Sequence, residues 1–277
     1  MGFLLQRILS KMADKCIMGF AHGPDYNWSV VRPFIRSLRE QATFDGDIVL
    51  FTNNKPNESG FKEADRNKLN EYQVTEIQVD LTQVAPWGQG FMMARFWQQE
   101  KTIRENPQWI RLVLVDTRDM IWQSNLGKFF QDDELHAQRE EIVIQDDKWF
   151  NSAGILASWG QEILDEVGDK PVLNSGSVWG GRNSLINLLE KMRSCGAKPN
   201  CDQHALNMLI HRGIVGAIQH PNDGEYIWTI GAMPGAKHIF ESGRVYMPDS
   251  KLPPCVHQYD RHAALKDKIW EYYDEVP

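Results

Sequence analysis

The chain has 277 residues, 42% of them hydrophobic and 24% charged, and its 30 basic and 37 acidic residues leave a formal net charge of −7. This length is sufficient for a large core, and the composition is that of an ordinary globular protein. The acidic balance argues against non-specific binding to nucleic acid, although it permits one local basic site for phosphate.

The first 15 residues predict a short amphipathic lead-in segment. Arg7 and Lys11 interrupt its apolar residues, which lie at positions 3, 4, 5, 8, 9 and 12. This pattern lacks the continuous apolar core of a signal peptide, and no part of the chain approaches the roughly 20 apolar residues that span a bilayer. We expect a lead-in helix, with weak contact to a membrane surface as the alternative.

The four cysteines have no short paired spacing in the sequence. They therefore predict no disulfide framework and favour a reduced, cytoplasmic protein. A zinc site made by Cys195, Cys201, His204 and Cys255 is a minor alternative, because the chain has no C-x-x-C pair of the kind found in many such sites.

The first half of the chain alternates strand-like and helix-like segments. Helices are expected over 27–41, 60–71 and 88–105, and strands over 16–21, 47–52, 74–80 and 110–116. Alternation of this kind predicts a mostly parallel sheet with helices on both faces. Ligands of such sheets bind beyond the carboxyl ends of the strands.

The second half is less regular. A strand is expected over 140–145, mixed and partly helical structure over 147–167, and a strand, a glycine-rich turn and a helix over 171–192. A short helix follows at 201–213, which Asp202 could cap and Gly213 could end. Short strands are expected at 214–219, 226–230, 237–240 and 254–257, before a final helix near 262–274.

The stretch VLVDTRDMIWQSN, residues 113–125, places Asp116, Arg118 and Asp119 directly after a buried strand. Carboxylates at such a strand end can bind Mg²⁺ or Mn²⁺ through their oxygens. The alternative is a turn in which Arg118 and Asp119 form an ion pair. His257 ends another apolar run and could supply a third ligand, although a lone histidine is more often structural.

Other polar residues could bind the remaining parts of a ligand. In LNSGSVWGG, residues 173–181, Asn174, Ser175 and Gly176 would let a sugar or phosphate approach the backbone closely, or would simply form a tight turn. Arg95 could reach a diphosphate or could be a solvated helix charge. The loop FAHGPDYNWS, residues 20–29, could stack a base and bind a ribose.

These segments, in this order over residues 16–262, resemble nucleotide-sugar-dependent glycosyltransferases of the GT-A fold. The matching pieces are VLVDTRDMIWQSN, VLNSGSVWGG, CDQHALNMLI and VHQYDRH. The resemblance implies a GT-A-like αβα sandwich around a mostly parallel central sheet. It also implies a single domain over 16–277, with a nucleotide-binding half at about 16–125 and an acceptor-side half at about 126–277.

By position, Asp116 and Asp119 resemble the Asp-x-Asp motif that binds a metal and a diphosphate. His257 resembles the late metal-binding histidine of glycogenin-like enzymes. The implied cofactor is Mn²⁺ or Mg²⁺. One departure is that the two carboxylates here are three positions apart, with Arg118 between them. One aspartate would then bind the metal only through water, or Arg118 would itself contact phosphate.

The resemblance implies transfer of a sugar from a nucleoside diphosphate sugar, most commonly a uridine diphosphate sugar, to a glycan or glycoconjugate, with retention slightly favoured. Asp202 and Gln203 would be catalytic residues, with Asp202 near the anomeric centre. The nucleotide would contact Phe20, Asn27, Arg95, Asp116 and Arg118, and the substrate would contact Asn174, Ser175, Gly176 and Tyr259.

Two alternatives stay open. A sugar nucleotidyltransferase would usually carry a basic glycine-rich loop after its first strand, and a non-catalytic carbohydrate-binding or nucleotide-binding protein could share the fold.

Overall fold

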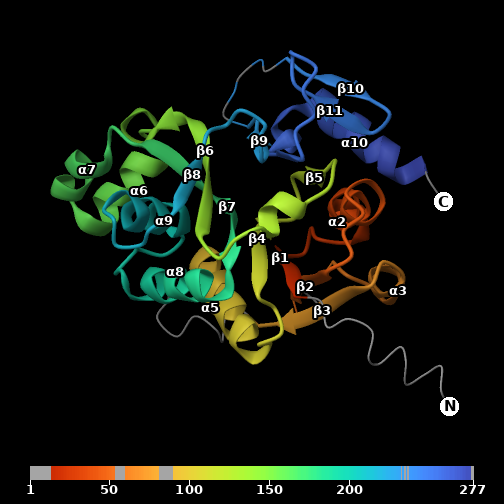
Figure 1. Ribbon diagram of the computed structural model, residues 1–277, viewed down its shortest axis with the longest axis horizontal. Helices are drawn as coiled ribbons and strands as arrows, with labels where there is room; N and C mark the ends of the chain where they lie inside the picture. The colour runs from red at the N-terminus through yellow and green to blue at the C-terminus, as the bar shows by residue number, and fades with distance from the viewer. Residues whose placement is uncertain are drawn as a thin grey trace.

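The computed structural model describes residues 14–53, 60–80, 90–231, 233, 235 and 237–275, so most of the expected lead-in lies outside the described residues. A central sheet of seven strands has the order β3-β2-β1-β4-β7-β6-β8 (Figure 1). Its strands are β1 (Lys15–Ala21), β2 (Asp47–Asn53), β3 (Val74–Val79), β4 (Arg111–Asp116), β6 (Leu135–Val143), β7 (Pro171–Gly181) and β8 (Ile218–His220).

The sheet is mostly parallel, as the sequence predicts. Neighbouring strands run parallel except at β7, which is antiparallel to both β4 and β6. The chain winds outward from β1 through β2 to β3 and then crosses to β4 on the other side of β1. The winding direction therefore reverses between β1 and β4. In open α/β sheets, the crevice beyond the carboxyl ends of the strands at such a reversal is where ligands bind.

The expected glycine-rich turn within 173–181 is wrong, because β7 continues through all of these residues. β7 pairs with β4 over residues 177–181 and with β6 on either side of residues 174–176, which lie at a register shift between Ala137 and Arg139 of β6. Its glycines mark close approaches instead. A Cβ atom at Gly176 would lie 2.2 Å from Oδ2 of Asp116, and one at Gly180 would lie 2.1 Å from the carbonyl oxygen of Glu134.

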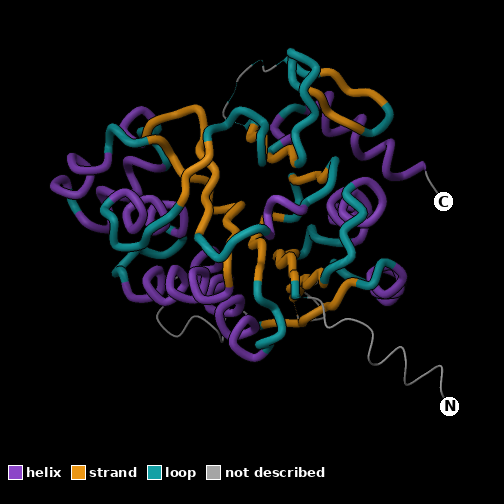
Figure 2. Tube along the Cα trace, in the orientation of Figure 1, coloured by secondary structure: helices purple, strands orange, loops and turns teal. Residues whose placement is uncertain are grey.

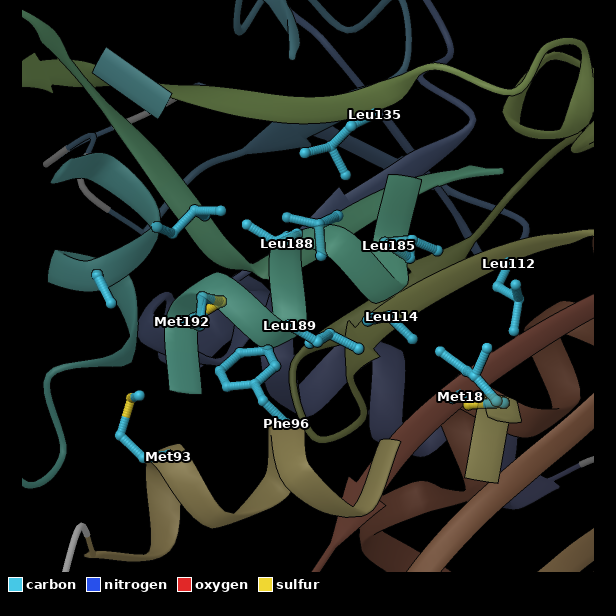
Figure 3. Packing of buried hydrophobic residues seen from close by; sticks show 14 of the residues in the cluster. Met18, Met93, Phe96, Leu112, Leu114, Leu135, Leu185, Leu188, Leu189 and Met192 are labelled. Carbon is cyan, nitrogen blue, oxygen red and sulfur yellow. The ribbon is translucent and has the colours of Figure 1, made fainter. Parts of the chain in front are cut away.

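Helices cover both faces of the sheet. Because alternate strand residues point to opposite faces, Ile17 packs in the cluster with α2 (Trp28–Arg36) and α3 (Glu63–Glu71), whereas Met18 packs toward the helices on the other face. Those helices are α5 (Gly90–Glu105), α8 (Arg182–Ser194) and α9 (Asp202–His211). Figure 3 shows residues of α5 facing residues of α8: Met93, Phe96, Leu185, Leu188, Leu189 and Met192.

The remaining helical elements are shorter. A π-helical turn, η1 (Ser37–Gln41), extends α2 and accounts for the rest of the helix expected over 27–41. The mixed region at 147–167 forms α6 (Asn151–Trp159) and α7 (Gln161–Val167). Short 3₁₀ turns are η2 (Gly127–Phe130), η3 (Ile144–Asp146) and η4 (Tyr259–Arg261). Among the described residues, no helix has both the length and the apolar character that crossing a bilayer requires.

A small second sheet joins the C-terminal segment to the loop after β4. It has the order β5-β12-β9, formed by Met120–Trp122, Cys255–His257 and Ile227–Thr229, of which β5 was not predicted. The hairpin of β10 (Ile239–Glu241) and β11 (Arg244–Tyr246) and the helix α10 (Ala263–Glu275) lie beyond it, at the upper right of Figure 2. In this sheet β12 runs antiparallel to β5, with His257 opposite Met120.

A histidine pair is packed beside the edge strand β8. The rings of His136 and His220 are stacked, and Nδ1 of His136 lies 2.9 Å from Nε2 of His220. The other ring nitrogen of His136 lies 2.7 Å from Oδ1 of Asp132. Burial and the neighbouring His136 lower the pKa of His220 to about 4. His220 is therefore neutral in the folded protein at pH 6, where the unfolded chain would bind the proton readily.

We predict that the free energy of unfolding decreases as the pH falls from about 6.5 toward 4. Because the pKa of His220 is lower in the folded protein than in the unfolded chain, its contribution to the free energy of unfolding is complete above the unfolded-state pKa. The contribution is lost as the pH falls toward the folded-state pKa. Because the ring is half-exposed, we expect a loss of only about 1 kcal/mol. Urea unfolding at pH 7 and pH 4.5 should show a smaller pH effect in His220→Gln than in the wild type. An unchanged pH effect in the variant would contradict this prediction.

Candidate metal centre and adjoining cleft

The three predicted metal ligands converge in the structure. Asp116 ends β4, Asp119 lies in the turn before β5, and His257 ends β12. Nε2 of His257 lies 3.6 Å from Oδ2 of Asp116 and 3.6 Å from Oδ1 of Asp119. The ligand atoms of all three residues lie within 4.8 Å of one another. In the part of the chain that the structure describes, no other group of three histidine, cysteine or acidic residues has this geometry, so the cysteine-based zinc alternative is not formed there.

Backbone hydrogen bonds hold the ligand-bearing segments together. The backbone N–H of Gln258 donates to the carbonyl oxygen of Asp119 at 2.8 Å, which ties β12 to the turn after β4. The hydroxyl of Thr117 donates to the carbonyl oxygen of Phe20 at 2.6 Å and ties the same turn to β1. Gln258 has a φ of 62°, in the left-handed region. Such a conformation is uncommon for a residue other than glycine, and backbone strain of this kind clusters at functional sites.

The environment of His257 fits a metal ion. Its side chain is fully buried, and neither ring nitrogen has a hydrogen-bond partner. Burial acts to lower the pKa of His257, but the carboxylates of Asp119 and Asp116 outweigh it and raise this pKa to about 10. In the absence of a metal, an imidazolium would thus balance the two acids. One imidazole nitrogen and two carboxylate oxygens are also a donor set that can bind a divalent metal ion.

Arg95 fixes the orientation of Asp116. Its guanidinium is buried and donates from Nη1 to Oδ1 of Asp116 and from Nη2 to Oδ2 of Asp202, each at 2.6 Å. Although burial opposes ionisation, Arg95 and His257 hold the pKa of Asp116 well below its usual range. Arg95 is therefore not a solvated helix charge. It leaves Oδ2 of Asp116 directed toward His257.

A polar cleft of about 520 Å³ adjoins Asp116. It contains most of the residues that were predicted to bind sugar and acceptor, namely Asn174, Ser175, Gly176, Asp202 and Gln203, together with Arg95, which was predicted to reach a diphosphate. Internal hydrogen bonds order this wall: Ser175 donates from its hydroxyl to Oδ2 of Asp202 at 3.0 Å and from its backbone N–H to Oε1 of Gln203 at 3.2 Å. The cleft lining also includes Met92, Asp116, Glu140, Ile142, Asp147, Phe150, Gln258 and Arg261.

A smaller pocket of about 200 Å³ is lined by Asp25, Tyr26, Val30, Arg118 and Trp270. Burial and the nearby carboxylates of the acidic motif raise the pKa of Tyr26 to about 12. The acidic motif contributes to both hollows, since Arg118 lines this pocket and Asp116 lines the cleft.

The alternative of an ion pair within the acidic motif is not what the structure contains. The half-exposed guanidinium of Arg118 pairs with the carboxylate of Asp260, with 3.3 Å between Nε and Oδ2. The partner comes from η4, so the pair links the motif to the C-terminal segment.

Three predicted binding residues have structural roles outside the cleft lining. Phe20 is buried and stacks on Phe51, with 4.5 Å between ring centroids. Asn27 caps α2, since its side chain accepts from the backbone N–H of Val30. Tyr259 is fully buried, and its hydroxyl donates to the carbonyl oxygen of Arg118 at 3.1 Å. This hydrogen bond therefore holds the backbone of the acidic motif at Arg118.

The sequence reasoning missed Glu140, Asp147 and Gln258. Glu140 lies on an expected strand, and a half-buried acid on a strand is a usable signal, since acids are seldom buried without a function or a partner. Gln258 directly follows a predicted ligand. Asp147 has no comparable signal, because only the folding of the segment before α6 brings it to the cleft.

We predict that Asp119→Asn and His257→Ala weaken Mn²⁺ binding by more than about 100-fold, because losing a direct ligand should cost more than losing an outer-shell partner. Isothermal titration calorimetry with Mn²⁺ alone would measure this. Asp267→Asn, which removes an exposed carboxylate from α10, is the matched control and should bind like the wild type. Equal Mn²⁺ affinity in all four proteins would show that the three residues form only an ion-paired cluster.

We also predict that Gly176→Ala weakens Mn²⁺ binding by about 10-fold to 100-fold, the effect expected when a ligand is displaced but not removed. The new Cβ atom would lie 2.2 Å from Oδ2 of Asp116 and must push it away from His257. Gly216→Ala is the control, because nothing lies within 4 Å of a Cβ atom there. Wild-type affinity in a folded Gly176→Ala protein would mean that Asp116 Oδ2 is not a ligand.

The comparisons with known proteins assign the chain to no family. No family model matches the sequence, and no curated protein matches it significantly.

Proposed function

We propose that this chain is a metal-dependent glycosyltransferase that moves a sugar from a nucleoside diphosphate sugar to a hydroxyl of a glycan or glycoconjugate. The observation that carries the proposal is the convergence of Asp116, Asp119 and His257 at the carboxyl ends of the strands, where the winding of the sheet reverses. Sites for phosphate-containing ligands are expected at this position in open α/β sheets.

The two hollows beside the acidic motif support a ligand with two unlike parts. The smaller pocket offers the aromatic side chains of Tyr26 and Trp270 together with the guanidinium of Arg118. Aromatic faces suit a base, and a guanidinium suits phosphate. A nucleoside in this pocket would place its diphosphate against Asp116 and Asp119.

The larger cleft supports binding of a sugar. Its wall combines amide side chains with carboxylates, including Asn174, Gln203 and Glu140. Both kinds of group form hydrogen bonds with hydroxyls, and a few converging polar groups in a concave site are typical of small-molecule recognition. A volume of about 520 Å³ is in the range of such sites.

A divalent cation bound at this site would stabilise the negative charge that develops on the departing diphosphate. Asp116, Asp119 and His257 would hold the cation, and Arg95 keeps Asp116 in place. Asp202, predicted to lie near the anomeric centre, borders the cleft, but its Oδ2 is already bound by Arg95 and Ser175. We therefore assign Asp202 a positioning role. Gln203 lies beside it in the cleft wall.

We predict that purified protein with Mn²⁺ slowly hydrolyses at least one of a panel of nucleoside diphosphate sugars, and that EDTA stops the reaction. Asp116→Asn should abolish it, because the amide removes one of the anionic ligands. Release of nucleoside diphosphate would be measured by coupled assay or chromatography. If the protein binds carbohydrate without turnover, it is a binding protein of this fold. If no donor shows metal-dependent binding or hydrolysis, the proposed function is wrong.

A further inference from the structure

Four carboxylates line the cleft, and three of them hold other parts of the site in place. Asp116 is held by Arg95 and faces His257. Asp202 is almost fully buried, and its Oδ2 accepts from Arg95 and from the hydroxyl of Ser175. Asp147 accepts from the side-chain amide of Asn151 at 2.6 Å and so holds the start of α6. Asp116 and Asp202 cannot take up a proton without breaking a contact that orders the site, whereas Asp147 keeps its Oδ1 unengaged.

The fourth carboxylate, Glu140 on β6, has a different environment. Oε1 accepts from Nδ2 of Asn174 at 2.5 Å. The amide of Asn174 is itself oriented, because its Oδ1 accepts from the backbone N–H of Gly176 at 2.7 Å. Two hydrogen bonds from uncharged donors therefore orient Glu140: the backbone N–H of Gly176 fixes the amide of Asn174, and this amide holds the carboxylate of Glu140. It lines the cleft and has no ion-pair partner within 4 Å among the described residues.

We propose that Glu140 is the general base of the transfer reaction and that the reaction inverts the anomeric configuration. This inference rests on the proposed function. A base must lie in the same cleft as the sugar, must be positioned, and must be able to accept a proton. Glu140 meets these conditions through an amide that is itself oriented toward the cleft wall, whereas the amide partner of Asp147 ties it to the start of α6. Burial raises the pKa of Glu140, against an opposing effect of the Asn174 hydrogen bond, and a raised pKa makes a carboxylate a better base.

The proposed step balances as a single displacement. The acceptor hydroxyl gives its proton to the free carboxylate oxygen of Glu140 while its oxygen forms a bond to the anomeric carbon. The bond from that carbon to the diphosphate oxygen breaks, and the diphosphate leaves with the electron pair. Attack from the face opposite the leaving group inverts the configuration. This outcome differs from the retention that the resemblance slightly favours.

Glu140→Gln tests the assignment, because the glutamine keeps the shape and can still accept from Asn174 but cannot take a proton. The neighbouring Glu141→Gln is the matched control, since Glu141 is exposed and does not line the cleft. The substrate is the nucleotide sugar that the donor panel identifies, with water as the acceptor. We expect hydrolysis to fall by at least about 100-fold in Glu140→Gln and to be unchanged in Glu141→Gln. Mn²⁺-dependent binding of the matching nucleoside diphosphate should be the same in all three proteins.

The wild-type reaction supplies a second readout that needs no variant. Proton NMR within the first minutes should show that the released sugar has the opposite anomeric configuration to the donor. A product with retained configuration, or hydrolysis by a folded Glu140→Gln protein at more than a tenth of the wild-type rate, would overturn the inference. Either result would leave the proposed function intact, whereas failure of the whole donor panel would refute the proposed function itself.

Discussion

The buried bridge from Arg95 to Asp116 and Asp202 connects the elements that build the site. Arg95 belongs to α5, and its two partners belong to β4 and α9, so one guanidinium joins a helix to the sheet and to a second helix. Without it, the buried Asp202 would keep only its hydrogen bond from Ser175, and Asp116 would keep only its contact with His257, so removing the guanidinium would be strongly destabilising. The same bridge decides which oxygen of Asp116 faces His257 and prevents Asp202 from acting as a free acid or base. The geometry of the metal centre and the assignment of Glu140 both depend on it.

The second constraint is the small sheet that brings the end of the chain back to the acidic motif. Pairing of β12 with β5 places His257 opposite Met120, one residue from Asp119. The apolar cluster beneath this sheet, which includes Trp228 and Tyr259, and the packing of α10 stabilise this return. The candidate ligands therefore come from segments about 140 residues apart, yet a strand register sets their spacing. A register slip of one residue would turn His257 to the opposite side.

Local sequence predicts the main strands and helices of the fold better than it predicts the short strands and the contacts that build the site. The alternating strands and helices of the first half can be predicted from the sequence, because each buried strand is a mostly apolar run between polar, periodic helices. The run that ends at Asp116 is an example. Strands β5 and β11 have three residues each and no pattern of their own, so only their partners make them strands. The segment with Gly176 was misassigned for a related reason. Glycine signals a turn locally, but here it accommodates Asp116 from the neighbouring strand.

Local sequence was sufficient to predict a mostly parallel sheet, an acidic motif at a strand end and the three candidate ligands, because burial patterns and ligand chemistry are properties of local segments. The division of roles among those residues depended on contacts between distant segments. Arg118 turned outward to Asp260, Arg95 became the buried bridge, and Phe20 and Tyr259 entered the core. Glu140 gained its significance in the same way, since a carboxylate becomes a candidate base only when the charges around it are known. Those charges come from strands and helices that are distant in the chain.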